Sequence, residues 1–578
     1  MSLEIQGSAP ITKVQQKLIR RVGRGSLSRV GDINVLKVAG SSYDMGYQHG
    51  VLLADEIRRG PIPYFRQMVE KLIGKGTLGP LSGLVWPTLQ RTVGRRVARE
   101  LPDFATETLH GLADGAGLDR QAFIDGCTMP DSIMWVAARL MQLRDGGPAT
   151  AHRIALELGC TSAVAWGDAT KDGSLLHARN FDYHGVGNWP ATKTVIFHEP
   201  DEGQRYVSVA AAGVALGGIT AMNESGLSLT VHQHMFTDKT RLGGVPIGLV
   251  GDIVMREAKN LDDAREILDA RTPIGCWTYI VTDGNTKEVL CYEENPDRNA
   301  PLRTTADDDT FGYANIYLDP ELGRTEMNLY GSYWRHNKGR HARVNELLED
   351  DRSEGPLDPQ GMAEILGDTG SGHCRVRDSI AMVMTVGSVV FRPEDGTVWV
   401  GTGEAPTSHG TFLPFSLAQE GHAPERGELL VEAEDSEAFE CFRRTYVAYV
   451  DHDDVPAARE HMEEACRLEP EQGLYHGLRG LLALNDGDGL AAERAFDRAL
   501  EIGHVDPERL ANFHLWRARA RDIAGRRTEA LADYRWCLGH YGDAPVHRAA
   551  KKGLKRAFTV KQARKVHVDI SFADVVMP

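Results

Sequence analysis

The stretch ELGCTSAVAWG at residues 157–167, followed by LHARNFDY at residues 176–183, decides how the rest of the chain is interpreted. Cys160 follows a glycine and begins a run of small and apolar residues with β-like alternation. The turn sequence KDG at 171–173 separates the two stretches, and this arrangement predicts a β-hairpin. Such a hairpin would fold the second stretch back beside Cys160.

The second stretch carries two charged residues, Arg179 and Asp182, that the hairpin would place near the Cys160 thiol. A thiol becomes a nucleophile when a neighbouring cation or base favours the thiolate. The alternative is that Cys160 is a small buried hydrophobic residue, as most free cysteines are. Arg179 and Asp182 would then form a structural ion pair.

The segment Gly159-Cys160-Thr-Ser, followed by DGSLLHARNFDY, resembles the acyl-CoA:6-aminopenicillanic acid acyltransferase-like family. These are autoproteolytic N-terminal-nucleophile (Ntn) cysteine hydrolases related to bile-salt and penicillin V hydrolases. The resemblance implies that the Gly159–Cys160 bond cuts itself and that Cys160 becomes a new chain N-terminus. The free α-amino group, with a pKa of about 7.7–8.0, can then serve as the base for its own thiol. The resemblance also implies that Asp182 holds this amine and that Arg179 lies near the thiol.

Two asparagines match positions that donate to the oxyanion in the resembled family. Asn223 lies in AMNESGL, and Asn315 lies in YANIY, where the family usually has Thr-Asn-His. The alternative for Asn223 is a hairpin-turn residue. An arginine usually follows in the family, and Arg335 and Arg343 both compete for that place. Five aromatic residues are candidates for an acyl pocket or for the core: Trp277, Tyr279, Tyr317, Tyr330 and Trp334.

Composition limits the class of protein. A chain of 578 residues is too long for one core and predicts two or three domains. The net charge of −16 argues against nucleic acid or an anionic membrane as a partner. The eight cysteines are scattered without a Cys-x-x-Cys pair, which signals neither a zinc site nor a disulfide framework. With no signal-peptide pattern at the N-terminus, we expect a soluble, cytoplasmic protein. The thioester chemistry that the resemblance implies needs no metal or redox cofactor.

The pattern of predicted elements divides the chain into five parts. Residues 1–159 are mostly helical, begin with a loosely held basic arm at 1–30, and would become the smaller chain after cleavage. Residues 160–416 are strand-rich with helical layers, an α+β class, and the resemblance implies the four-layer αββα Ntn-hydrolase sandwich. Residues 417–436 are interpreted as a linker, 437–558 as an all-α repeat domain, and 559–578 as a tail.

The helical part has an internal period. Ala458, Met462, Ala465 and Leu468 recur 34 residues later as Ala492, Phe496, Ala499 and Ile502. A helix-turn-helix period of 34 residues is typical of tetratricopeptide repeats. The repeats would cap the catalytic part, form a homo-oligomer contact, or bind a protein partner.

These observations predict a cysteine Ntn amidohydrolase that cleaves an N-acyl amide through a thioester on Cys160. One alternative is an acyltransferase that moves the acyl group from a thioester such as acyl-CoA to an amine. A second alternative is a repeat-based interaction scaffold with an inactive enzyme body. In the first two cases the partner is a small-molecule amide or acyl thioester.

Overall fold

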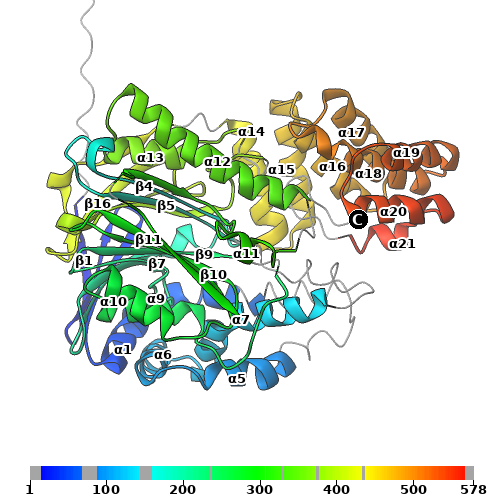
Figure 1. Cartoon of the computed structure of the whole chain (residues 1–578). Helices are drawn as coiled ribbons and strands as arrows, with labels where there is room; N and C mark the ends of the chain where they lie inside the picture. Colours follow the sequence, from blue (N-terminus) through cyan, green and yellow to red (C-terminus); the bar gives the residue numbers. More distant parts are fainter. Residues whose placement is uncertain are drawn as a thin grey trace, which may run out of the picture.

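The computed structural model describes residues 15–64, 66–67, 87–142, 159–234, 237–305, 307–327, 331–372, 377–432 and 436–566. Within this part, two β-sheets lie one above the other, with helices above and below them, and a region made of helices follows (Figure 1). The α+β class expected for the strand-rich part agrees with this mixed content.

The larger sheet has ten described strands, which cross the boundary expected at residue 160. In spatial order they are β1 (Lys17–Val22), β2 (Gly25–Val30), β3 (Ile33–Gly40), β6 (Lys193–Pro200), β7 (Tyr206–Ala211), β8 (Thr220–Asn223), β9 (Leu227–Gln233), β10 (Trp277–Asp283), β11 (Glu288–Asn295) and β12 (Arg298–Arg303). β3 pairs in parallel with β6, and the other neighbours are antiparallel. The expectation of a loose arm is therefore wrong for residues 17–30, which form the strands β1 and β2, and most of β2 is buried.

The smaller sheet contains the two stretches that carry Cys160 and Arg179. Its order is β13 (Thr310–Tyr313), β4 (Gly159–Ala165), β5 (Leu176–Asp182), β14 (Thr385–Arg392), β15 (Thr397–Gly401), β16 (Gly410–Ser416) and β17 (Gly421–His422), and β18 (Leu429–Val431) pairs with β16. The predicted hairpin is confirmed, because β4 and β5 are antiparallel neighbours with Cys160 opposite Phe181. The linker expected at 417–436 is wrong for its described part, since β17 and β18 extend the sheet there.

Helices cover the outer sides of both sheets (Figure 1). α12 (Gly331–Glu354) and α13 (Pro359–Gly367) contact the smaller sheet. On the side of the larger sheet lie α1 (Ser42–Leu52), α2 (Ala54–Ile57), α5 (Arg95–Ala98), α6 (Asp103–Ala116), α7 (Arg120–Met141), α9 (Ile247–Glu257) and α10 (Leu261–Asp269), and the short α11 (Pro320–Gly323) follows β13 in the chain. α1 and α6 approach closely because glycines face backbone: a Cβ on Gly46 would lie 2.0 Å from the carbonyl oxygen of Thr108.

The C-terminal helical region, defined here as residues 437–563, lies at one side of the two-sheet part (Figure 1). It contains α14 (Glu437–Tyr446), η8 (Val447–Asp451), α15 (Val455–Leu468), α16 (Gly473–Asn485), α17 (Gly489–Ile502), η9 (Pro507–Arg509), α18 (Leu510–Ile523), α19 (Arg527–Gly539), α20 (Ala544–Lys555) and α21 (Val560–Ala563). The repeat assignment stays a prediction. Among all the helices described, none combines the length and the apolar character needed to cross a bilayer.

Candidate active site

Cys160 is the second residue of β4, an interior strand of the smaller sheet, and is buried. Nη2 of Arg179, from the paired strand β5, donates to the Cys160 Sγ at 3.3 Å. Burial raises the pKa of the Cys160 thiol, whereas the Arg179 charge opposes that rise. The cation predicted to favour the thiolate therefore contacts the sulfur, in an environment that otherwise keeps the thiol protonated.

The backbone nitrogen of Cys160 is the atom that cleavage would turn into an α-amino group. It donates to Oδ1 of Asn315 at 2.8 Å, although the two residues are far apart in sequence. Nδ2 of Asn315 donates to the carbonyl oxygen of Gln233 at 3.0 Å, which uses one of its two hydrogens. The asparagine thus connects the Cys160 nitrogen to the end of β9.

Asp182 lies at the end of β5, directly opposite Gly159 in the β4–β5 ladder. Its Oδ1 accepts a hydrogen bond from Thr385 at 2.7 Å, and its Oδ2 lies 4.0 Å from a guanidinium nitrogen of Arg340. A Cβ on Gly159 would come within 2.9 Å of the same Oδ2. The glycine before Cys160 is therefore required by the close approach of the carboxylate.

Arg340, on α12, is a site residue that the sequence reasoning missed. It is fully buried, and Nη1 donates to the Cys160 carbonyl oxygen at 2.7 Å and to Oγ1 of Thr161 at 3.0 Å. Nη2 donates to Oδ1 of Asn315 at 3.0 Å and to Oδ1 of Asn337 at 2.8 Å. Asn337 in turn donates to the Asn315 carbonyl oxygen at 3.0 Å. One helix therefore fixes both the nucleophile strand and the Asn315 loop.

Neither arginine that competed for this place in the sequence reaches Cys160. Arg343 lies one turn further along α12 and pairs with both carboxylate oxygens of Asp368, at 3.1 and 2.8 Å. Arg335 points to the helical region and pairs with Asp506 and Glu508. The three-residue spacing of Asn337 and Arg340 places both on one face of the helix, but this signal does not single out Arg340, because it does not show which face contacts β4.

Asn223 is not brought together with the other predicted residues. It ends β8 at the hairpin before β9, and its Nδ2 donates to the carbonyl oxygens of Met255 and Ala258 at 3.2 and 2.9 Å. Its Oδ1 accepts from the backbone nitrogens of Ser225 and Leu227. The Asn223 side chain holds the turn to the end of α9. Its contacts are those of a turn residue, and they do not match the expected role as an oxyanion donor.

An apolar cavity of about 160 Å³ opens beside Cys160 and Arg179. Residues of α7 and of the segment 213–216 line it, together with Phe181, Tyr183 and Trp189. Of the aromatic candidates, Trp277 lines the cavity, whereas Tyr279 and Tyr317 are buried without lining it, Trp334 lies on α12, and Tyr330 is outside the described residues. The sequence therefore missed the aromatic walls at 181–189, which immediately follow the site residues of β5.

Other buried groups hold the cavity walls. The backbone nitrogen of Gly213 donates to Nε2 of His49 at 3.0 Å, and burial lowers the pKa of His49 to about 3. A neutral imidazole is required for this acceptor role, so the low pKa and the geometry agree. His49 thus holds the backbone of the wall segment at Gly213. Among the described residues, no group of three or more metal-ligating side chains gathers.

A family model matches the part of the chain that carries most of these residues. Residues 169–405 match the model of a family described as acyl-coenzyme A:6-aminopenicillanic acid acyl-transferase. Cys160 lies shortly before the matched segment, which contains Arg179, Asp182, Asn315 and Arg340.

Two curated relatives are similar over part of their length. An uncharacterized protein of Archaeoglobus fulgidus is 27% identical over 347 residues, covering 54% of this chain and 55% of its own. Protein dcd1B of Dictyostelium discoideum is 24% identical over 208 residues, covering 33% of this chain and 37% of its own. The chain thus spans about half the length of the first relative and less of the second. Residues 169–405 are therefore similar to the acyl-coenzyme A:6-aminopenicillanic acid acyl-transferase family.

Proposed function

We propose that the chain is an autoproteolytic cysteine Ntn hydrolase with the αββα layer order, and that it cleaves the amide bond of an N-acyl compound. The observation that carries the proposal is the pair of contacts on one residue: Arg179 binds the Cys160 sulfur, and Asn315 binds the Cys160 nitrogen. An N-terminal nucleophile needs both groups, since the sulfur attacks and the amine moves the proton.

Activation begins at the Gly159–Cys160 peptide bond. The Cys160 sulfur attacks the Gly159 carbonyl carbon, its proton passes to the Cys160 nitrogen, and the peptide bond breaks as a thioester forms. Water then hydrolyses the thioester, which leaves Gly159 with a carboxylate and Cys160 with a free thiol and amine. Arg340 holds the carbonyl oxygen of Cys160, and Asn315 holds the nitrogen of Cys160, so the new chain terminus stays in place.

Turnover uses the same atoms. The α-amino group of Cys160 takes the thiol proton while the sulfur attacks the substrate carbonyl. It then passes that proton to the amine that leaves the substrate as the acyl thioester forms. Asp182, close to Gly159, would hold the protonated amine. The second hydrogen on Nδ2 of Asn315 is the donor that we propose for the oxyanion. Asn223 has no part in this scheme.

The cavity beside Cys160 limits the kind of acyl group that the substrate can carry. Its walls are aliphatic and aromatic apart from Arg179, the cysteines and Gln233, and the volume of about 160 Å³ is on the order of that needed for a benzene-sized group. We therefore propose an uncharged apolar acyl group such as phenylacetyl. Water is the acceptor in hydrolysis, and the family description favours an amine acceptor as the second candidate.

The test is the intact mass of the purified protein beside its Cys160→Ala variant, followed by turnover of N-phenylacetyl p-nitroanilide. We expect two fragments, the larger beginning at Cys160, and a single chain in the variant. Release of p-nitroaniline that is lost in Cys160→Ala supports hydrolysis, and a new acyl amide formed on adding glycine methyl ester supports acyl transfer. A single chain in both proteins that releases no p-nitroaniline refutes the proposal and favours the scaffold alternative.

A further inference from the structure

The helix that carries Arg340 is also bound by the C-terminal helical region. Nε of Arg335, five residues before Arg340, donates to Oδ2 of Asp506 at 3.0 Å, and Nη1 lies 2.8 Å from Oε2 of Glu508. The Asp506 side chain is itself held, since its Oδ1 accepts from the backbone nitrogen of Glu508 at the start of η9. The Arg335 guanidinium also lies over the ring of Tyr541. A fixed acidic turn of the helical region therefore clamps the first part of α12.

A second contact joins the helical region to the walls of the apolar cavity. Oδ1 of Asp451, the last residue of η8, accepts from the Tyr64 hydroxyl at 2.8 Å. Its Oδ2 accepts from the backbone nitrogen of Gly187 at 2.9 Å. Tyr64 follows the cavity residues Pro61 and Ile62 in sequence, and Gly187 lies between the cavity residues Tyr183 and Trp189. One carboxylate thus ties together two separate wall segments.

The apolar core continues across the same boundary. Tyr183 and Trp189 belong to one cluster of buried residues with Phe439, Phe442 and Tyr446 of α14. The Tyr446 hydroxyl lies 3.0 Å from Nδ1 of His184, in the same wall segment. Removing the helical region would therefore expose the outer, apolar side of the cavity wall to water, which is unfavourable.

We propose that the C-terminal helical region supports the acyl-binding site from outside the cavity, and that Arg335 and Asp451 are the positioning residues of this support. The proposal rests on the function proposed above. Arg335 sets α12 and, through it, Asn337 and Arg340. Asp451 sets the wall segments at 61–64 and 183–189 and thereby the fit of the acyl group.

The two contacts predict different kinetic effects. Loss of Arg335 displaces the helix that orients Cys160 and Asn315, so kcat falls while KM changes little. Displacement of reacting groups by about 1 Å costs roughly 100-fold in rate, and a partial shift costs about 10-fold. Loss of Asp451 loosens the cavity wall, so the preference for N-phenylacetyl over N-acetyl p-nitroanilide falls about 10-fold, mainly through KM.

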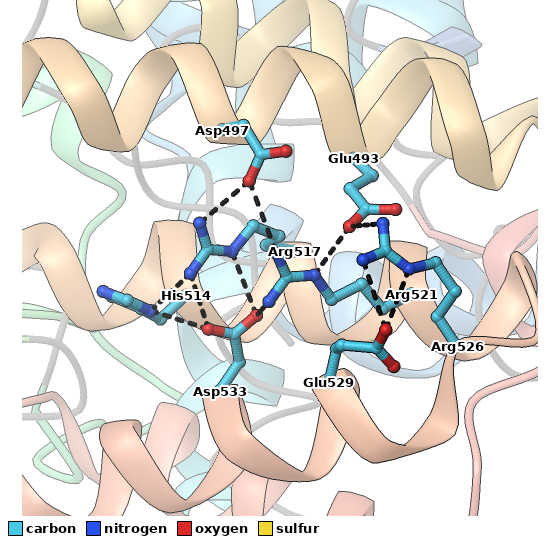
Figure 2. Close-up of polar contacts among 8 residues, drawn as sticks. All are labelled: Glu493, Asp497, His514, Arg517, Arg521, Arg526, Glu529 and Asp533. Atoms are coloured by element: carbon cyan, nitrogen blue, oxygen red, sulfur yellow. Dashed lines mark hydrogen bonds and ion pairs between the residues drawn. The ribbon is translucent and has the colours of Figure 1, made fainter.

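The chain offers matched controls. Arg343→Ala removes an arginine of similar exposure from the same helix, but its partners Asp368 and Glu346 lie outside the helical region. Asp497→Ala removes a charge inside the helical region whose partners, Arg517 and Arg521, also lie in that region. Figure 2 shows its setting, a network between α17, α18 and α19 that comprises Glu493, Asp497, His514, Arg517, Arg521, Arg526, Glu529 and Asp533.

The experiment compares the full-length Arg335→Ala and Asp451→Ala proteins with these two controls by kinetics on the two anilides and by amide hydrogen exchange. We expect faster exchange in 334–342 for Arg335→Ala and in 183–189 for Asp451→Ala, and no change there in the controls. Tyr64→Phe, which deletes a single hydroxyl, replaces Asp451→Ala if that variant does not fold, and Arg335→Lys replaces Arg335→Ala.

Amide hydrogen exchange tests whether the helical region positions α12 and the wall segment 183–189, even if the wild type cleaves neither anilide. A wild type that cleaves neither anilide would count against the proposed function alone. Wild-type exchange in both segments of the two test variants would overturn the inference. Unchanged kcat in Arg335→Ala together with an unchanged acyl preference in Asp451→Ala, on an active wild type, would overturn it equally.

Discussion

Replacing Gly159 by alanine tests the geometry of the candidate site with one methyl group. The new Cβ would lie 2.9 Å from Oδ2, 3.1 Å from Cβ and 3.4 Å from Cγ of Asp182. Carbon contacts are most favourable at about 3.5–4.0 Å, so the Asp182 side chain must move by roughly half an ångström. Its Oδ1 is held by Thr385 at 2.7 Å, and the side chain is buried, so this movement strains a packed layer.

Two magnitudes follow from that displacement. Overpacking of a tight core costs about 1–3 kcal/mol of unfolding free energy. Because the added methyl group lies on the residue whose carbonyl carbon Cys160 attacks, and displaces it relative to Asp182, we expect self-cleavage to slow about 10- to 100-fold in Gly159→Ala. Intact mass at timed intervals after synthesis measures the rate of cleavage, and chemical denaturation of Gly159→Ala and wild type, both in the Cys160→Ala background, measures stability without cleavage.

Gly387→Ala is the matched control for this test. Gly387 lies in β14 of the same sheet, and its new Cβ would lie 3.6 Å from the Cβ of Phe181, an ordinary contact. We expect this control to be processed at the wild-type rate. If Gly159→Ala also cleaves at the wild-type rate and keeps its unfolding midpoint, the close approach of Asp182 has no consequence and the reasoning is refuted.

Three further predictions concern the buried polar groups. Arg340→Met leaves the buried carboxylate of Asp182 without the Arg340 cation. We therefore expect the free energy of unfolding, measured by denaturation, to fall by about 3–5 kcal/mol, and self-cleavage to be lost; a stable variant that still cleaves contradicts this. Asn315→Ala should abolish self-cleavage in a folded protein, whereas Asn223→Ala should lower stability and leave self-cleavage in place. Intact mass measures cleavage and thermal melting measures stability; loss of cleavage in Asn223→Ala but not in Asn315→Ala would restore the oxyanion role expected for Asn223. Burial raises the pKa of Glu294 to about 8, so the folded state retains a proton that the unfolded state has lost between about pH 4.5 and 8. The free energy of unfolding therefore falls with rising pH by about 1.4 kcal/mol per unit at most, and Glu294→Gln should flatten the decline measured by denaturation between pH 6 and 8; equal slopes would contradict the pKa.

The β4–β5 hairpin could be predicted because all its information is local. The turn, the alternation and the spacing that returns Arg179 to Cys160 all lie within residues 157–183. The role of Arg340 could not be predicted, because this residue contacts Cys160 from a helix that lies 180 positions later in the sequence. No spacing rule in the sequence selects Arg340 over Arg335 or Arg343 on the same helix, since the choice depends on which face of α12 contacts β4.

Asn223 shows the opposite failure. Its segment matches a family turn, and the turn is present, but the side chain is consumed by the carbonyl groups at the end of α9. A motif indicates the backbone conformation more reliably than the partner of a side chain. The expected linker failed for a similar reason, because the polar run at 417–436 contains short edge strands whose pairing with β16 is non-local.

The parallel pairing of β3 with β6 makes the two fragments of a cleaved chain inseparable. Residues before Gly159 supply three strands of one continuous sheet and the α7 wall of the cavity, so neither fragment has a complete core alone. Self-cleavage would therefore release no inhibitory peptide. It would create a two-chain protein whose subunits arise in equal amounts from one translation product, and whose separation requires unfolding of the sheet.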